Sequence, residues 1–145
     1  MSDTTTAPAA ADAATQAALE RLNTVIDRLI APDGCPWDST QTPESLTEYV
    51  IEECHELVDA IRSGKTADMV EELGDVAFLI LMIGKLMART GGPSLADALE
   101  VEAAKMVRRH PHVFSDTTYE NPSEQLKDWD RIKREEKAAA DAEGP

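Results

Sequence analysis

The chain has 145 residues, a hydrophobic fraction of 42% and a formal net charge of −14 at pH 7. This length fits one domain with a sizeable core, and an aromatic fraction of only 4% makes that core aliphatic. The negative charge argues against binding to nucleic acid polymers or anionic membranes, because their phosphate groups would be repelled. Two cysteines do not form a disulfide framework. We expect neither a signal peptide nor a membrane-spanning segment, which makes the cytoplasm the expected location.

The N-terminal part of the chain predicts a tail followed by a helix. Residues 1–14 have few large apolar side chains, which predicts disorder. Residues 15–30 place apolar side chains at helical spacing, and the turn at residues 31–34 ends that helix. The following loop contains Trp37. We interpret this side chain as a packing anchor, and a base-stacking platform is the less favoured alternative.

Two further helices are predicted on either side of Gly64. The first begins at Thr42, a typical N-cap residue, and ends near Ser63, where Gly64 suits a left-handed cap. The second begins near Thr66 and ends at about Arg89, before a Gly-Gly-Pro segment. Because the connection is short, the two helices are expected to be antiparallel neighbours.

Acidic residues on these two helices form the main candidate site. Glu52, Glu53 and Glu56 fall within about one third of the circumference of the first helix. Its apolar residues are predicted to gather on the opposite side, namely Leu46, Val50, Cys54, Leu57 and Ile61. Glu72 and Asp75, three residues apart, share a face of the second helix. Antiparallel packing would let the two acidic faces meet.

Such a meeting of carboxylates requires a positive partner. Carboxylates a few Å apart repel by roughly 3–4 kcal/mol per pair at an effective dielectric near 20. A hard divalent cation offsets this repulsion, and Mg²⁺ is the natural candidate, with Mn²⁺ as a second choice. The alternative is a solvated acidic helix face without a metal. The spacing alone favours neither interpretation over the other.

The second of these helices also predicts self-association. Its central segment, residues 76–83, is apolar on all sides. A single small domain can cover only one side of such a helix, so the other side is expected to face another subunit. We therefore expect a homodimer or a homotetramer.

The C-terminal part of the chain predicts two more helices. One begins near Ser94 and ends at Arg109, and its last turns carry a basic patch of Lys105, Arg108 and Arg109. This patch either compensates the helix dipole or contacts phosphate. Another helix is capped at Asn121. Residues 15–137 thus form one all-α domain, and residues 138–145 are predicted to be a disordered tail.

Five motifs, in this order, resemble those of the MazG nucleoside triphosphate pyrophosphohydrolases. They are Gly34-Cys35-Pro36-Trp37-Asp38, Glu52-Glu53-x-x-Glu56, Glu72-Leu73-Gly74-Asp75, Arg108-Arg109-His110-Pro111-His112-Val113-Phe114 and Trp129-x-x-Ile132-Lys133. The similarity extends over about residues 19–137. It implies an all-α fold whose helices pair across subunits into four-helix-bundle cores. It also implies Mg²⁺-dependent hydrolysis of a nucleoside triphosphate to a monophosphate and pyrophosphate, with a house-cleaning role on non-standard nucleotides as a further expectation.

The resemblance also implies a role for particular residues. The expected metal ligands are Glu53, Glu56, Glu72 and Asp75. Glu52 and Glu53 are the expected catalytic residues, and Glu52 would bind a further metal or help to deprotonate the attacking water. The expected substrate-binding residues are Lys105 and Arg109, at the phosphates, and Trp129 and Lys133, near the nucleotide.

Two other functions compete with this one. Glu52-x-x-His55 matches one metal-binding element of di-iron carboxylate bundles, although such bundles need a second one. The other alternative is a catalytically weak module that serves oligomerisation or regulation.

Overall fold

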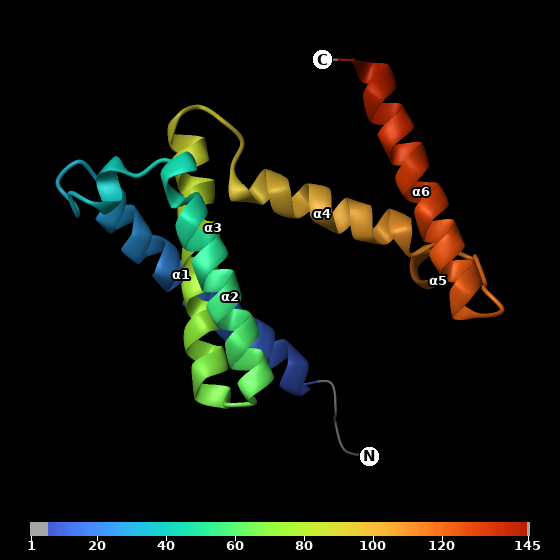
Figure 1. The fold of residues 1–145 in the computed structure, drawn as a ribbon, viewed down its shortest axis with the longest axis horizontal. Helices are drawn as coiled ribbons and strands as arrows, with labels where there is room; N and C mark the ends of the chain where they lie inside the picture. Colours follow the sequence, from blue (N-terminus) through green and yellow to red (C-terminus); the bar gives the residue numbers. More distant parts are fainter. Residues whose placement is uncertain (1–5, 145) are drawn as a thin grey trace. The chain divides into compact units, whose positions relative to one another are not determined.

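The structure is a computed structural model that describes residues 6–144, and every regular element in this range is helical (Figure 1). The predicted all-α fold is therefore confirmed. The chain divides into two compact units, with the boundary after Leu95. Among the helices that the structure describes, none has the length and apolar character needed to cross a bilayer.

The first unit contains three long helices. These are α1 (Thr6–Ile30), α2 (Thr47–Ser63) and α3 (Thr66–Arg89). Two short 3₁₀ turns, η1 (Asp38–Thr40) and η2 (Glu44–Leu46), lie between α1 and α2. Helices α2 and α3 run antiparallel and side by side as a hairpin (Figure 1).

The core of this unit is aliphatic, as the composition predicts. Side chains from α1, η2 and α3 form it, namely Ile26, Leu46, Leu79, Leu81, Met82 and Leu86. Leu22, Val50, Phe78 and Leu95 pack against it. Helix α3 contributes most of these residues and is therefore the central element of the unit.

The connection between α2 and α3 follows the sequence prediction. Gly64 has a φ of 71°, a left-handed conformation that glycine adopts without steric cost, and its N–H donates to the carbonyl of Ile61. Helix α3 begins two residues later, at Thr66, and ends at Arg89 as predicted. This tight turn places the acidic segments of the two helices opposite each other.

The start of α2 differs from the prediction. The Oγ1 of Thr42 accepts a hydrogen bond from the N–H of Ser45, and the Oγ of Ser45 accepts one from the N–H of Thr42. This reciprocal cap starts the 3₁₀ turn η2, and regular α-helix begins only at Thr47. Thr42 therefore caps a helical start, but of a tighter kind than predicted.

The loop between α1 and α2 is fixed by the end of α3. The guanidinium of Arg89 donates hydrogen bonds to the carbonyls of Ile30, Ser39 and Gln41, at 3.2 to 3.3 Å. Asp38 is buried within this loop. These contacts hold the loop that carries Trp37 in one conformation.

The second unit contains α4 (Leu95–Arg109, whose first residue belongs to the first unit), the short helix α5 (Pro111–Phe114) and α6 (Pro122–Glu143). The side chain of Asn121 accepts a hydrogen bond from the N–H of Glu124, which confirms the predicted cap of α6. Within this unit, Ile132 of α6 is buried. Helix α5 was not predicted from the sequence.

Helices extend into both segments that were predicted to be disordered. Helix α1 begins at Thr6, so residues 6–14 are helical, and α6 continues to Glu143. Residues 1–5 and 145 lie outside the described range. The physical reason is alanine content, because alanine has the highest intrinsic helix propensity and both segments are rich in it.

Candidate active site

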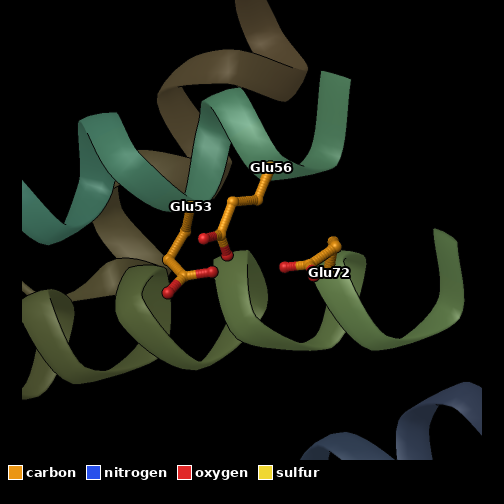
Figure 2. Close-up of side chains that lie close together, drawn as sticks. All are labelled: Glu53, Glu56 and Glu72. Carbon is orange, nitrogen blue, oxygen red and sulfur yellow. The ribbon is translucent and has the colours of Figure 1, made fainter. Parts of the chain in front are cut away.

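Three predicted acidic residues come together between α2 and α3. Glu53 and Glu56 point from α2 toward α3, and the carboxylate of Glu72 lies on the facing side of α3 (Figure 2). Each offers one carboxylate oxygen, and these oxygens all lie within 4.8 Å of one another. Within the described part of the chain, none of the three takes part in a salt bridge.

Helical spacing explains why Glu53 points inward. On α2, Val50, Glu53, Leu57 and Ala60 follow one another at steps of three or four residues, and all four are buried or half-buried. The predicted separation of acids from apolar residues is therefore wrong for Glu53. It is also wrong for two residues assigned to the apolar side, because Cys54 and Ile61 are exposed. One carboxylate thus occupies a position on the packed face of the helix.

The electrostatics of the cluster favour loss of negative charge. One oxygen of Glu53 and one of Glu72 are buried and have no hydrogen-bond partner. Burial, together with the charge of Glu56, raises the pKa of Glu53 from 4.5 to about 7. Burial and the charge of Glu56 also raise the pKa of Glu72. A bound cation would oppose both shifts, because its positive charge favours the ionised form of each carboxyl group.

The other predicted residues of the acidic segments lie outside this group of three. Asp75 is exposed, but its charge contributes to the raised pKa values of Glu53 and Glu72. Glu52 and His55 are exposed on α2. The described residues contain no metal-binding group that includes His55, so the di-iron alternative gains no support from the geometry.

The predicted substrate-binding residues all belong to the second unit, whereas the acidic residues belong to the first. The guanidinium of Arg109 lies 5.4 Å from the ring centroid of Trp129, a cation–π arrangement. The ammonium of Lys105 pairs with Glu102 at 2.6 Å. Lys133 is exposed on α6. The structure thus brings Arg109 and Trp129 together.

Sequence reasoning missed Glu136, which neutralises part of the basic patch. Its carboxylate pairs with Arg109 at 2.8 Å and with Arg108 at 2.6 Å. Hydrogen bonds from these two guanidinium groups lower the pKa of Glu136 to about 2. No spacing rule could have identified this contact, because α4 and α6 are separated by a long segment.

The histidine motif packs as a chain of rings. The ring of His110 contacts Trp129 edge-on, with centroids 5.0 Å apart, and His112 lies 5.2 Å from Tyr119. One ring nitrogen of His110 is 2.6 Å from the carbonyl oxygen of Met106. The hydroxyl of Tyr119 donates to Asp128. These contacts connect α4, α5 and α6 within the second unit and orient Trp129.

Taken together, the fold and the cluster define an all-helical protein with a carboxylate group suited to divalent cations. Residues 41–114, about half of the chain, match the MazG nucleotide pyrophosphohydrolase domain, and the chain belongs to this family. The matched range contains all five predicted acids together with Lys105 and Arg109. Trp129 and Lys133 lie beyond it.

Individual relatives agree with this assignment. The chain is 40% identical over 118 residues to the nucleoside triphosphate pyrophosphohydrolase/pyrophosphatase MazG of Thermotoga maritima, covering 81% of this chain and 45% of that protein. It is 40% identical over 121 residues to the nucleoside triphosphate pyrophosphohydrolase of Escherichia coli K12, covering 83% and 46%.

A solved structure is similar over nearly its whole length. The crystal structure of a mazG-related protein from Thermotoga maritima has a TM-score of 0.66 and 29% identity, covering 79% of this chain and 98% of that one. In contrast, the chain spans less than half of the length of the curated relatives named above. The likeness therefore concerns the domain, and those relatives contain further sequence.

Proposed function

We propose that this chain hydrolyses nucleoside triphosphates between the α and β phosphates, releasing a nucleoside monophosphate and pyrophosphate. The observation that carries the proposal is the group of three carboxylates whose oxygens lie within 4.8 Å, in a chain of the MazG family. The names of the relatives from Thermotoga maritima and Escherichia coli support the same activity.

The acidic residues fit a divalent cation. The group offers only carboxylate oxygens, the ligands that Mg²⁺ and Mn²⁺ prefer. Two of these oxygens are buried without a hydrogen-bond partner, which is costly for a carboxylate that has no cation. Glu53, Glu56 and Glu72 would hold the ion, with Asp75 as the fourth ligand. When bound, Mg²⁺ would neutralise phosphate charge and increase the acidity of a water molecule.

Other side chains would transfer the proton and bind the phosphates and the nucleotide. Glu52 is exposed and directly precedes Glu53 in the sequence, and it would accept the proton of the attacking water. Lys105 and Arg109 would contact the phosphates and neutralise the leaving pyrophosphate. Trp129 and Lys133 would contact the nucleotide. Non-standard nucleotides are included in the proposed substrates, which makes a house-cleaning role part of the proposal.

The proposal includes a homo-oligomer, either a dimer or a tetramer. Val70, Leu73 and Ile80 recur along one side of α3, and their exposed fractions are 68%, 60% and 49%. Helix α2 exposes Ile51, Val58 and Ile61 in the same manner. Apolar rows of this kind are more typical of subunit interfaces than of solvated surfaces. A second copy of the chain would cover them.

The activity is tested with a panel of standard and non-standard nucleoside triphosphates in the presence of Mg²⁺, with pyrophosphate release as the readout. We expect Glu53→Gln and Asp75→Asn to lower kcat by roughly 10²-fold or more, because each removes a negative ligand without changing side-chain size appreciably. Removal of Mg²⁺ with a chelator should abolish turnover of the parent.

The matched control is Glu48→Gln, an exposed acid on the same helix that does not belong to the cluster. It should retain the parental rate, and circular dichroism should show unchanged helix content for all variants. Equal rates for Glu53→Gln, Glu48→Gln and the parent would contradict the assignment of the cluster. A parent without turnover on any triphosphate would instead favour the regulatory module.

A further inference from the structure

Two aromatic side chains lie beside the carboxylate group and are not used by the function proposed above. The rings of Trp37 and Tyr49 meet edge to face, with centroids 5.6 Å apart and planes at 86°. Trp37 is 48% exposed and Tyr49 is 40% exposed. Both rings therefore present a large part of their surface outward, where a ligand can reach them.

The surrounding chain holds both rings in place. The carbonyl of Trp37 accepts hydrogen bonds from the side chains of Thr40 and Gln41, both at 3.0 Å, and the next residue, Asp38, is buried. Tyr49 lies on α2 one helical turn before Glu53, so both side chains lie on the same side of the helix. The pair is therefore a fixed surface and is not a flexible loop tip.

The two rings and the acidic residues line one cavity. Its volume is about 250 Å³, and its walls are Trp37, Tyr49, Glu53, Asp75, Phe78 and Leu79. Glu53 also belongs to the group of three carboxylates, so this cavity and the cluster share a wall. The walls of the cavity are thus acidic at Glu53 and Asp75, and aromatic or apolar at the two rings, Phe78 and Leu79.

We propose that Trp37 and Tyr49 form the platform that binds the nucleobase of the triphosphate substrate. This inference rests on the function proposed above. In a nucleotide only the sugar separates the base from the first phosphate, so a base site has to lie next to the residues that hold the phosphate-bound cation. The cavity beside Glu53 and Asp75 satisfies this requirement.

The size and chemistry of the cavity define what it accepts. It is smaller than the roughly 300–1,000 Å³ typical of sites for whole drug-sized ligands, which suits a base rather than an entire nucleotide. Its walls contain no amide or guanidinium group, and its two carboxylates, Glu53 and Asp75, are assigned to the cation. Stacking on aromatic rings tolerates any base. The platform therefore favours a nucleoside triphosphate over the same sugar triphosphate without a base. It discriminates only weakly among different bases.

The test compares a nucleoside triphosphate with ribose 5-triphosphate, which has the same sugar and phosphates but no base. We expect the parent to have the higher kcat/KM for the nucleotide. Trp37→Ala should lower that value roughly 5- to 150-fold, mainly through KM, a range that corresponds to a stacking free energy of about 1–3 kcal/mol. It should leave the value for ribose 5-triphosphate unchanged. Trp37→Phe and Tyr49→Phe keep a ring and should retain most of the preference.

Three outcomes of this comparison bear on the role of Trp37. An equal loss for both substrates would show that Trp37 has only a structural role, and a retained preference in Trp37→Ala would place the base elsewhere. Either outcome overturns the platform but leaves the proposed hydrolysis intact. If the parent cleaves neither compound, the hydrolysis fails, and titration calorimetry of the parent and of Trp37→Ala with the same two compounds tests the platform on its own. Equal affinity of the parent for both would then overturn it.

Discussion

Glu53 occupies a position where the spacing along α2 would place an apolar side chain. It follows Val50 and precedes Leu57 and Ala60 on the packed face of the helix. A carboxylate at such a position is either protonated or compensated by a cation, because charge there is poorly solvated. The pKa of Glu53 is accordingly raised to about 7, because the protonated form is favoured when no cation is bound.

Metal-free protein should therefore lose stability as the pH rises. The folded state holds the proton of Glu53 up to a pKa of about 7, whereas the ordinary pKa of a glutamate side chain is 4.5. Between these two values the folded state binds more protons than the unfolded state, so the free energy of unfolding falls with increasing pH. Thermal denaturation in the presence of a chelator, followed by circular dichroism from about pH 5 to 8, measures this decline.

Two controls identify the source of that decline. Glu53→Gln removes the titrating group, so its melting temperature should depend less on pH over the same interval. Added Mg²⁺ should raise the melting temperature of the parent more at the alkaline end, where the carboxylates are charged. A parent whose stability increases with pH across this interval would show that Glu53 is not held in its protonated form.

At the scale of elements, close packing at Gly84 fixes how the chain leaves α3. A Cβ added at Gly84 would lie 2.8 Å from the Cβ of Leu95, a residue that packs against the core of the first unit. Gly74, on the same helix, has no atom within 4 Å of such a Cβ. Close packing therefore requires a glycine at position 84 of α3 but not at position 74.

We predict opposite effects of the same substitution at these two positions. Gly84→Ala should destabilise the protein, because overpacking typically costs about 1–3 kcal/mol and outweighs the gain of up to about 1 kcal/mol in helix propensity. Gly74→Ala should be neutral or stabilising, since only the propensity gain applies. Chemical denaturation of both variants measures the difference. A Gly84→Ala variant as stable as Gly74→Ala would show that Leu95 can move away at little cost.

Most helices could be predicted from the sequence, because their signals are local. Gly64 and Asn121 mark a helix end and a helix start by their own backbone and side-chain chemistry, and both were found in these roles. The shared carboxylate group also followed from spacing and one short turn. The 3₁₀ start before Thr47 and the helical conformation of residues 6–14 and 138–143 depend on finer balances of propensity.

Contacts between distant segments could not be predicted in the same way. The pairing of Glu136 with Arg109 joins α6 to α4, and the ring pair of Trp37 and Tyr49 joins a loop to α2. The sequence shows each of these residues but not its partner, because such contacts depend on how elements pack. The sequence alone favours a packing role for Trp37, whereas the structure shows its ring 48% exposed and in contact with Tyr49.

On the scale of the whole molecule, the apolar rows of α2 and α3 predict a stable oligomer. Sedimentation of the parent should give a dimer or a tetramer at micromolar concentrations. Ile80→Lys should weaken assembly, because it would bury an unpaired charge in the interface. Val25→Lys, at an exposed position of α1, is the control and should assemble normally. A folded parent that sediments as a monomer would rule out the proposed interface.

All three clustered carboxylates come from one hairpin whose two arms are joined by the short turn at Gly64. Closing so short a connection costs little chain entropy, so this hairpin can form early during folding. The repulsion among Glu53, Glu56 and Glu72 is then present before the remaining helices dock. Divalent cations would consequently accelerate folding as well as support turnover, and the rate of refolding would depend on their concentration.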